Sequence, residues 1–398
     1  MSSLLCPQCG QTLSASATIC ATCQYSIKPA FLPRSGISRR AVLLGLGMGG
    51  LLVAVNASLG LTLVRKGGAP LAASMQRSNH KLLAPPPGTT LYTYHGHSAQ
   101  VNSVAWSPDS TRISSGANDE TVQIWDATTG GHVMTYRGHA GVVSHVAWTP
   151  TGNRIASGSG DKTVQVWNAA TGGHLYTYKG HTSAVNTVSW SPDGARIVSG
   201  GQDTTAQVWD AATGGHVFTY RGHDGSVFGV AWSPDGKYIA SCGPDRTVQI
   251  WDAATGKLVY TYKRHTAAVH QARWSPDSTH IASCSDDATV HVWNVASGNL
   301  VSTYKRHTKA VEALDWSPTG KQIASGGADG TVQVWNAKTG ALVFSFRDQP
   351  THKRELLPLE RFDSVSGVKT VNYSPNGSSI ASGGSYTKTV NVTTSGGG

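Results

Sequence analysis

Residues 181–220 read HTSAVNTVSWSPDGARIVSGGQDTTAQVWDAATGGHVFTY. Apolar and polar residues alternate over 185–190, and short strand-like runs follow at 196–199, 206–209 and 217–220. Turn residues separate these runs: Ser191-Pro192-Asp193-Gly194, Gln202-Asp203 and Ala212-Thr213-Gly214-Gly215. None of the runs has the helical period. The stretch therefore predicts four short antiparallel strands, which is one blade of a β-propeller.

The same pattern recurs along the chain with a fixed period of 42 residues. Two series with this spacing hold all 12 tryptophans of the protein: Trp106, Trp148, Trp190, Trp232, Trp274 and Trp316, and Trp125, Trp167, Trp209, Trp251, Trp293 and Trp335. A period of this size indicates a repeat protein in which each repeat is one supersecondary unit. We therefore expect an all-β fold.

Composition and charge fit a turn-rich repeat protein. Glycine accounts for 46 of 398 residues, and six cysteines are too few for a disulfide-dense secreted scaffold. The net charge of +10 is uneven, because residues 1–87 contain eight basic side chains and no acidic one. The rest of the chain holds 24 basic and 22 acidic side chains, a net charge of +2. This balance argues against a large nucleic-acid-binding surface on the repeats.

The repeats resemble the WD-repeat β-propeller family. The resemblance covers about 89–395 and rests on a recurring Gly-His pair, the Ser-Pro-Asp-Gly turn and a Trp-Asp pair, as in Trp125-Asp126, Trp209-Asp210 and Trp251-Asp252. It implies a rigid disc that binds other proteins.

Six repeats are complete, and two fragments remain. Residues 373–377 (YSPNG) take the place of the turn after the first strand of a seventh unit, 380–383 and 389–392 follow as its second and third strands, and a fourth strand is missing. Leu91-Tyr92-Thr93-Tyr94 matches the fourth strand of the other repeats but has no first three. In the family an N-terminal strand commonly joins the last blade, and closure removes exposed sheet edges. We expect seven blades, the last closed by the N-terminal strand.

The resemblance further implies a buried hydrogen-bonded tetrad in each complete blade, in which Trp donates to Ser, Ser bonds His and Asp holds His. The offsets of 18, 4 and 6 residues recur six times. A catalytic triad is the alternative interpretation of Ser, His and Asp, but six copies favour a structural network. The predicted tetrads are His97, Ser115, Asp119 and Trp125; His139, Ser157, Asp161 and Trp167; His181, Ser199, Asp203 and Trp209; His223, Ser241, Asp245 and Trp251; His265, Ser283, Asp287 and Trp293; and His307, Ser325, Asp329 and Trp335.

The seventh unit departs from this pattern. It keeps Ser382 but has Thr393 in place of Trp, and an insertion at about 348–364 replaces the Gly-His corner. We expect this blade to be the least stable.

Variation among the repeats concentrates on the first strand, at Asn102, Ser144, Asn186, Phe228, His270, Glu312 and Lys369. Phe228, His270 and Glu312 come from consecutive blades, and we predict that they form a partner-binding patch. Neutral variation of exposed residues is the alternative.

Two further side-chain sets recur at equivalent positions. One set is basic: Arg137, Lys179, Arg221, Lys263, Lys305 and Arg347. These residues could form a cationic rim for an anionic partner or a ring of solvated charges, and we favour the solvated ring. Cys242 and Cys284 lie in adjacent blades, too far apart for a disulfide, and we expect buried free thiols.

The N-terminal residues 1–27 predict a small zinc ribbon. Cys6, Cys9, Cys20 and Cys23 form two C-x2-C pairs, which suit tetrahedral zinc, with disulfides as the alternative. The Cys-Pro-Gln-Cys-Gly form resembles the small zinc ribbons of prokaryotic proteins, which suggests a bacterial source. Metal would supply the folding energy of so small a unit.

Residues 41–64 contain no charge and are long enough for a transmembrane helix. Basic residues in 28–40 precede this stretch, and a Pro-rich linker over 65–88 follows it. Ser38-Arg39-Arg40 resembles a twin-arginine export signal, so an uncleaved signal is one alternative and a cleaved signal is another. Basic residues on both sides leave the orientation open, but thiolates need a reducing compartment, which favours the ribbon in the cytoplasm and the propeller outside.

The sequence thus predicts a single-pass, membrane-anchored scaffold with a non-catalytic propeller that binds protein partners. An enzyme would need a non-repeated group of acids, bases or ligands in the central channel, and we recognise none in the sequence. The other alternative is a nucleic-acid-binding or regulatory protein that acts through the ribbon, with the propeller as sensor or ligand-binding module.

Overall fold

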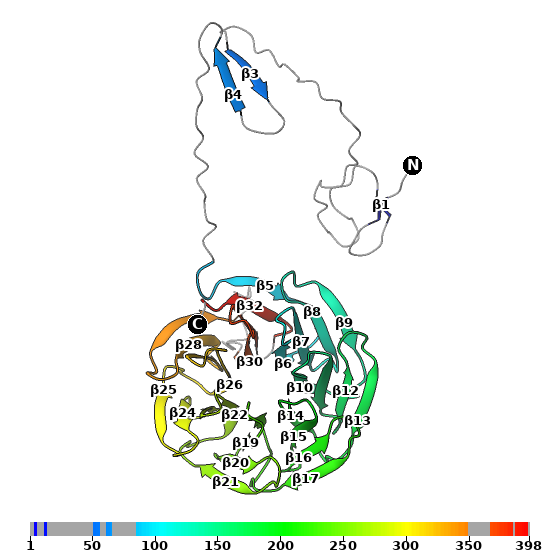
Figure 1. Cartoon of the computed structure of the whole chain (residues 1–398), viewed down its shortest axis with the longest axis vertical. Helices are drawn as coiled ribbons and strands as arrows, with labels where there is room; N and C mark the ends of the chain where they lie inside the picture. Colours follow the sequence, from blue (N-terminus) through cyan, green and yellow to red (C-terminus); the bar gives the residue numbers. More distant parts are fainter. Residues whose placement is uncertain are drawn as a thin grey trace, which may run out of the picture. The chain divides into compact units, whose positions relative to one another are not determined.

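The computed structural model describes residues 85–348, 367–384 and 387–396, together with four strands within the first 83 residues. The chain divides into two units, Met1–Leu83 and Ala84–Gly398, which are described separately. The second unit consists of seven four-stranded antiparallel sheets arranged as the blades of a ring (Figure 1). The prediction of a seven-bladed β-propeller is confirmed.

Each of the first six blades uses four consecutive strands. Blades 1 to 3 comprise β6 (Val101–Trp106), β7 (Arg112–Ala117), β8 (Val122–Asp126) and β9 (His132–Tyr136); β10 (Val143–Trp148), β11 (Arg154–Ser159), β12 (Val164–Asn168) and β13 (His174–Tyr178); and β14 (Val185–Trp190), β15 (Arg196–Gly201), β16 (Ala206–Asp210) and β17 (His216–Tyr220). Blades 4 to 6 comprise β18 (Gly229–Trp232), β19 (Tyr238–Cys242), β20 (Val248–Asp252) and β21 (Leu258–Tyr262); β22 (Val269–Trp274), β23 (His280–Ser285), β24 (Val290–Asn294) and β25 (Leu300–Tyr304); and β26 (Val311–Trp316), β27 (Gln322–Gly327), β28 (Thr331–Asn336) and β29 (Leu342–Arg347).

Blade 7 joins the two ends of the propeller. Its strands are β30 (Val368–Tyr373), β31 (Ser379–Gly384), β32 (Val390–Thr394) and β5 (Thr90–Tyr94). β32 pairs antiparallel with β5, with Val390 opposite Tyr94 (Figure 1). This confirms the predicted closure by the N-terminal strand, which covers the edge of β32 and gives blade 7 four strands like the other blades.

Polar side chains hold the turns between the strands of a blade. Asp193 accepts hydrogen bonds from the Ser191 hydroxyl and from the Ala195 amide at 2.9 Å, so the turn after the first strand is fixed. Asp210, the acidic residue of a Trp-Asp pair, accepts a 2.8 Å bond from the Thr213 amide. Gly214 then takes φ = +69°, which glycine adopts without a steric penalty. The repeated turn residues therefore set both the length and the direction of each strand.

The core lies between the blades. Seven clusters of buried apolar residues each join two neighbouring blades. At six of the seven interfaces, a tyrosine of one outer strand stacks on the third-strand tryptophan of the next blade, as Tyr94 does on Trp125 with ring centroids 4.1 Å apart. The interface between blades 6 and 7 has Phe346 and Thr393 at these positions, without a tyrosine-tryptophan stack. Aromatic stacking contributes about 0.5–1.5 kcal/mol per pair, and the interface between blades 6 and 7 lacks this contribution.

In the N-terminal unit, β1 (Leu4–Leu5) pairs with β2 (Thr12–Leu13), and β3 (Leu51–Val55) pairs with β4 (Leu61–Arg65). Of the stretch 41–64, predicted as a transmembrane helix, the structure describes only the residues that belong to β3 and β4, which pair as antiparallel strands. In the part of the chain that the structure describes, no helix is long and apolar enough to cross a membrane. The rest of 41–64 and Cys6, Cys9, Cys20 and Cys23 lie outside the described residues.

Candidate interaction surfaces

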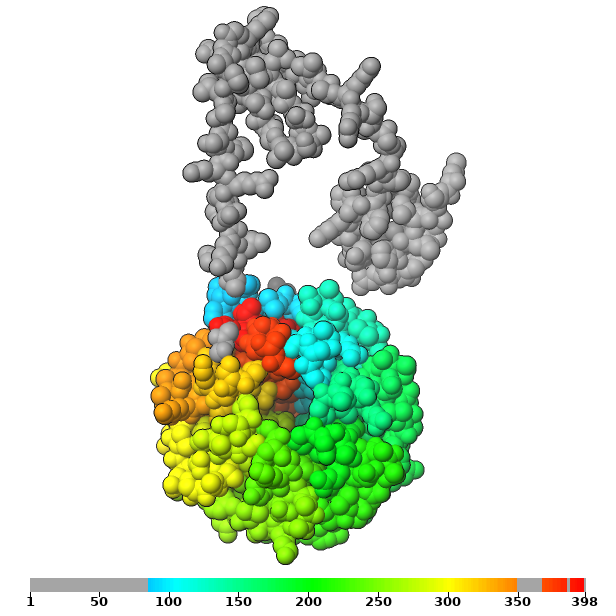
Figure 2. Space-filling view, in the orientation of Figure 1, coloured from blue at the N-terminus to red at the C-terminus, as the bar shows by residue number. Residues whose placement is uncertain are grey.

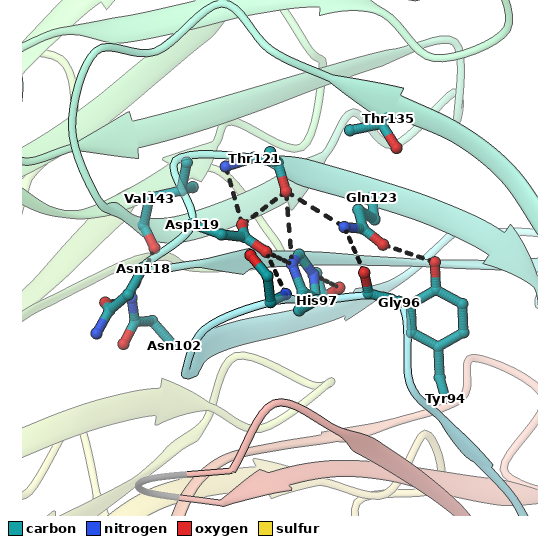
Figure 3. Close-up of polar contacts among 12 residues, drawn as sticks. Tyr94, Gly96, His97, Asn102, Asn118, Asp119, Thr121, Gln123, Thr135 and Val143 are labelled. Carbon is teal, nitrogen blue, oxygen red and sulfur yellow. Dashed lines mark hydrogen bonds and ion pairs between the residues drawn. The ribbon is translucent and has the colours of Figure 1, made fainter.

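The predicted tetrads are brought together inside the blades. In blade 1, His97 lies on the chain between β5 and β6 and points toward two side chains (Figure 3). Its Nδ1 lies 2.8 Å from Asp119 Oδ2, and its Nε2 lies 2.6 Å from Ser115 Oγ. Asp119 also accepts bonds from the Thr121 amide and hydroxyl. The carboxylate therefore fixes both the histidine ring and the turn that leads into β8.

All six complete blades repeat the contacts of the histidine. The His–Asp distances are 2.7–2.9 Å and the His–Ser distances are 2.6–2.9 Å. The tryptophan varies: in blades 2, 3, 4 and 6 its Nε1 donates to the serine at 3.0–3.3 Å. In blades 1 and 5, Trp125 and Trp293 have a buried Nε1 without a hydrogen-bond partner among the described residues. The fourth member of the expected network is thus linked in four blades of six.

The burial of these groups rules out access by a substrate. All six tetrad serines are fully buried, and the histidine side chains have no exposed area. Burial would raise the pKa of Asp203, but hydrogen bonds from His181 and Thr205 outweigh burial and hold this pKa well below its usual value. A permanently ionised carboxylate next to a shielded histidine is a structural clamp.

Blade 7 replaces the missing histidine with Asp348, which directly follows β29. Its carboxylate accepts a hydrogen bond from the Ser382 hydroxyl and a 3.3 Å bond from Asn391 Nδ2, and its backbone carbonyl also accepts from Asn391. Asp348 is only 2% exposed. An acidic residue from the start of the predicted insertion therefore enters the blade and bonds the retained serine, a substitution that we did not predict.

The predicted patch contains a stacked pair. The rings of Phe228 and His270 lie parallel, with an interplanar angle of 9° and centroids 5.7 Å apart, and both side chains are half-buried. His270 Nε2 lies 2.6 Å from Asp286 Oδ1. Glu312 is half-buried at the equivalent position of blade 6. Two members of the patch are thus in direct contact across blades 4 and 5.

Equivalent residues in other blades have a different task. Asn102 donates to the Val143 carbonyl at 2.9 Å, and Asn186 donates to the Val227 carbonyl at 3.0 Å (Figure 3 shows Asn102 and Val143). Each asparagine thus ties its own blade to the next. Phe228 has no amide to make this bond, and β18 begins one residue after it, later than the first strand of the other blades. The patch therefore lies at a departure from the repeat pattern among the six complete blades.

The two other recurring sets of side chains are the ring of cations and the cysteine pair. The six predicted rim cations, Arg137, Lys179, Arg221, Lys263, Lys305 and Arg347, are all exposed. Cys242 and Cys284 are buried free thiols, as predicted, and burial raises the pKa of Cys242 to about 12.

A central cavity of about 570 Å³ contains charged residues that the sequence reading missed; Figure 2 shows the ring hollowed at its centre. First strands line this cavity, with Asp315 from β26, Arg273 from β22 and His145 from β10. Asp315 accepts 2.8 Å bonds from Asn372 Nδ2 and the Tyr373 amide, and burial raises its pKa to about 6 against the opposing charge of Arg273. Burial and Arg273 lower the pKa of His145 to about 3. The expectation that the channel holds no such non-repeated group was wrong.

These charges were detectable in the repeat alignment. The residue before each first-strand tryptophan is Ala105, Ala147, Ser189, Ala231, Arg273 or Asp315, and Asn372 takes this place in blade 7. Four blades have a small residue at this position, two have a charged residue and one has an amide. The difference is visible only when the repeats are compared at this position.

Comparison with protein families agrees with the geometry. Six segments of the chain match the WD40 family (WD domain, G-beta repeat): residues 88–126, 130–168, 172–210, 214–252, 256–294 and 298–336. Together they cover more than half of the chain, which therefore belongs to the WD40 repeat family. Each segment begins with the outer strand of one blade and ends with the third strand of the next. No match to a curated protein was found.

Proposed function

We propose that this protein is a non-catalytic scaffold that holds a partner protein against one face of a rigid ring. The observation that carries the proposal is the stacked pair of Phe228 and His270. Two neighbouring blades present an aromatic ring and a histidine where blades 1 and 3 use asparagine to bond the adjacent backbone. Aromatic residues are enriched at the centres of protein interfaces. Phe228, His270 and Glu312 therefore form the partner-binding patch.

Site-specific crosslinking in cells tests the patch. We expect p-benzoylphenylalanine at position 228 or 312 to give the same adduct by mass spectrometry, and the matched position Asn102 to give none. Replacing His270 by Ala should abolish the adduct at position 228. Adducts of equal yield at all three positions would contradict the proposal, since they would report collisions with the surface.

We also propose that residues 41–64 attach the protein to a membrane, with the ribbon in the cytoplasm and the propeller on the other side. The support is the absence of charge over 24 residues and the basic residues on both sides. A two-stranded pair would leave backbone groups unpaired in lipid, so insertion requires the helical form. We expect carbonate-resistant pelleting and protease accessibility of the propeller in spheroplasts. Release by carbonate would refute insertion.

Zinc binding is proposed for Cys6, Cys9, Cys20 and Cys23 on the basis of their spacing alone. The purified full chain should contain one zinc ion per molecule by elemental mass spectrometry. A Cys6→Ser and Cys20→Ser double variant should contain none, while a Cys242→Ala control should keep it. Equal zinc content in all three proteins would disprove this site.

A second candidate function is ligand binding in the central cavity, which Arg273 and Asp315 favour because they place opposite charges on its wall. A small zwitterion has the matching charges. Isothermal titration with a set of amino acids, in wild type and an Arg273→Gln variant, tests this function.

The nucleic-acid alternative predicts a salt-sensitive gel shift that is lost on chelation of zinc.

A further inference from the structure

Two side chains of each blade occupy the space next to the following blade, and we call them fillers. The repeats are equivalent, so the two filler positions recur at all seven blade interfaces. The first filler comes from the start of the second strand and covers the first-strand tryptophan of the next blade. The Arg112 guanidinium lies 4.9 Å from the Trp148 ring centroid, and Arg196 lies 5.0 Å from that of Trp232. At the next interface, Tyr238 stacks on Trp274 at 6.3 Å.

The second filler comes from the outer strand and packs against a turn glycine of the next blade. A Cβ added to Gly130 would lie 2.9 Å from the Tyr92 ring, and one added to Gly256 would lie 2.8 Å from Phe218. The Tyr92 hydroxyl donates to the Ala127 carbonyl at 2.9 Å. Six interfaces have a large side chain here: Tyr92, Met134, Tyr176, Phe218, Tyr260 and Phe344.

Blades 5 and 6 form the exception (yellow to orange in Figure 1). The outer-strand filler is Ser302, and the only atom within 4 Å of a Cβ added to the turn residue Gly340 is a backbone oxygen, at 3.6 Å. The first filler is His280, whose Nδ1 lies 2.6 Å from the hydroxyl of Thr279 on its own turn. His280 is thus shorter than Arg112 and Arg196, and Ser302 takes the place of a large side chain at the same interface.

A cavity of about 400 Å³ lies at this interface. Its lining includes Trp316, Ala337 and Lys338 from blade 6, and Val301, His280 and Asp277 from blade 5. Val301 is 40% exposed, so the lining reaches the surface. The Ala337 carbonyl accepts a 2.6 Å bond from the Ser302 hydroxyl and keeps a second lone pair.

We propose that this cavity binds a tyrosine side chain of a partner protein. The ring takes the space that Tyr92 and Tyr260 occupy at their interfaces, and its hydroxyl donates to the Ala337 carbonyl as Tyr92 donates to Ala127. The lining carries Asp277, whose counterparts Asp109 and Asp193 lie in the blades that use arginine as the filler, but it also carries Lys338, where other blades have Thr128 or Ala254. This additional cation disfavours an arginine in the cavity. This inference rests on the proposed scaffold function but uses a different surface from the patch at Phe228.

The test measures binding of N-acetyl-tyrosine amide to the full chain by saturation-transfer NMR, with titration to roughly 10 mM, as suits a ligand of this size. N-acetyl-leucine amide and free zwitterionic tyrosine are the comparison probes. We expect the tyrosine amide to bind at least about tenfold more tightly than the leucine amide. Binding of only the zwitterion, or equal binding of the two amides, would overturn the proposal.

Two variants locate the binding. Ser302→Tyr restores the outer-strand filler and should abolish binding, whereas the matched control Ser345→Tyr, on the exposed outer strand of blade 6, should not. His280→Arg restores the other filler and should also abolish binding. It therefore tests the site even if Ser302→Tyr fails to fold. Binding unchanged in the folded filler variants would refute the site. The crosslink at position 228 should persist in them, so the failure of this inference differs from the failure of the scaffold function.

Discussion

The serine, histidine and aspartate of blades 1 to 6 act as a clamp because the serine and the histidine side chain are fully buried and the aspartate is nearly so. Ser199 Oγ accepts from Trp209 Nε1 at 3.2 Å and lies 2.8 Å from His181 Nε2. Ser283 has the histidine contact, at 2.9 Å, while Trp293 Nε1 makes no hydrogen bond with the described residues. Two serines with the same role in the repeat thus have different numbers of buried partners.

This difference predicts unequal costs of removing the hydroxyl. Ser199→Ala should lower the free energy of unfolding by about 2–3 kcal/mol, because it leaves two buried polar groups unpaired. Ser283→Ala should cost about 1 kcal/mol less. Urea denaturation followed by near-ultraviolet circular dichroism measures both. Equal costs would show that the indole bond contributes nothing.

Asp315 predicts a pH dependence of stability. Burial raises its pKa to about 6, above the unfolded value near 4, so the folded state prefers the protonated form. The stabilisation is complete below about pH 4 and is lost as the pH rises through 6. Asp315→Asn should therefore be more stable than wild type by about 1–3 kcal/mol at pH 8 and similar to it at pH 4. Thermal melts across this range test the prediction; the exposed Asp224→Asn variant should show no such crossover.

The strand β5 contributes more to the fold than its five residues suggest. It supplies the outer strand of blade 7, and Tyr94 stacks on Trp125 of blade 1. Without it, β32 would present an unpaired edge, and the interface with blade 1 would lose its aromatic pair.

Two shortened chains separate the role of β5 from that of the first unit. A chain that begins at Ala84 should keep the melting temperature of the propeller. A chain that begins at His95 should melt at least about 5 °C lower and form oligomers through the free edge of β32, as size-exclusion chromatography with light scattering would show. Identical melting of the two chains would contradict the closure.

Blade 7 as a whole should open first. Its interface with blade 6 has Phe346 and Thr393 instead of the tyrosine-tryptophan stack, and Asp348 replaces the clamp histidine. Hydrogen exchange should show amides of β30–β32 and β5 exchanging faster than those of β14–β17, with an opening free energy lower by about 1–3 kcal/mol. Uniform protection around the ring would contradict this ranking.

Much of the ring was predictable from the sequence, because the fold depends on features that repeat. The 42-residue period of Trp and His defined the blades, and the match of 91–94 to the other outer strands revealed the closure. The features that escaped prediction are single departures from the repeat. Asp348 enters blade 7 from the start of an insertion, and nothing in the spacing indicates where its side chain points.

The two cavities escaped prediction for a related reason. Each depends on residues that are distant in the chain but adjacent in space. Arg273 and Asp315 become neighbours only when the first strands meet at the centre. His280 lines the second cavity, and Ser302 takes the place of a large side chain at the same interface and bonds the Ala337 carbonyl on the lining. A periodic pattern predicts the side chains that most blade interfaces share. The proposed binding sites depend instead on residues that differ from this pattern.

The closure of blade 7 also sets the order of events during synthesis. Thr93 donates to Asn391, which is translated 298 residues later. At roughly 5–20 residues per second, β5 leaves the ribosome about 15–60 s before its partner strand exists. Six blades have time to stack in sequence while β5 still lacks its partner strand. The propeller therefore becomes a closed ring only after β32 has been synthesised, and a nascent chain that stalls before residue 390 remains an open arc.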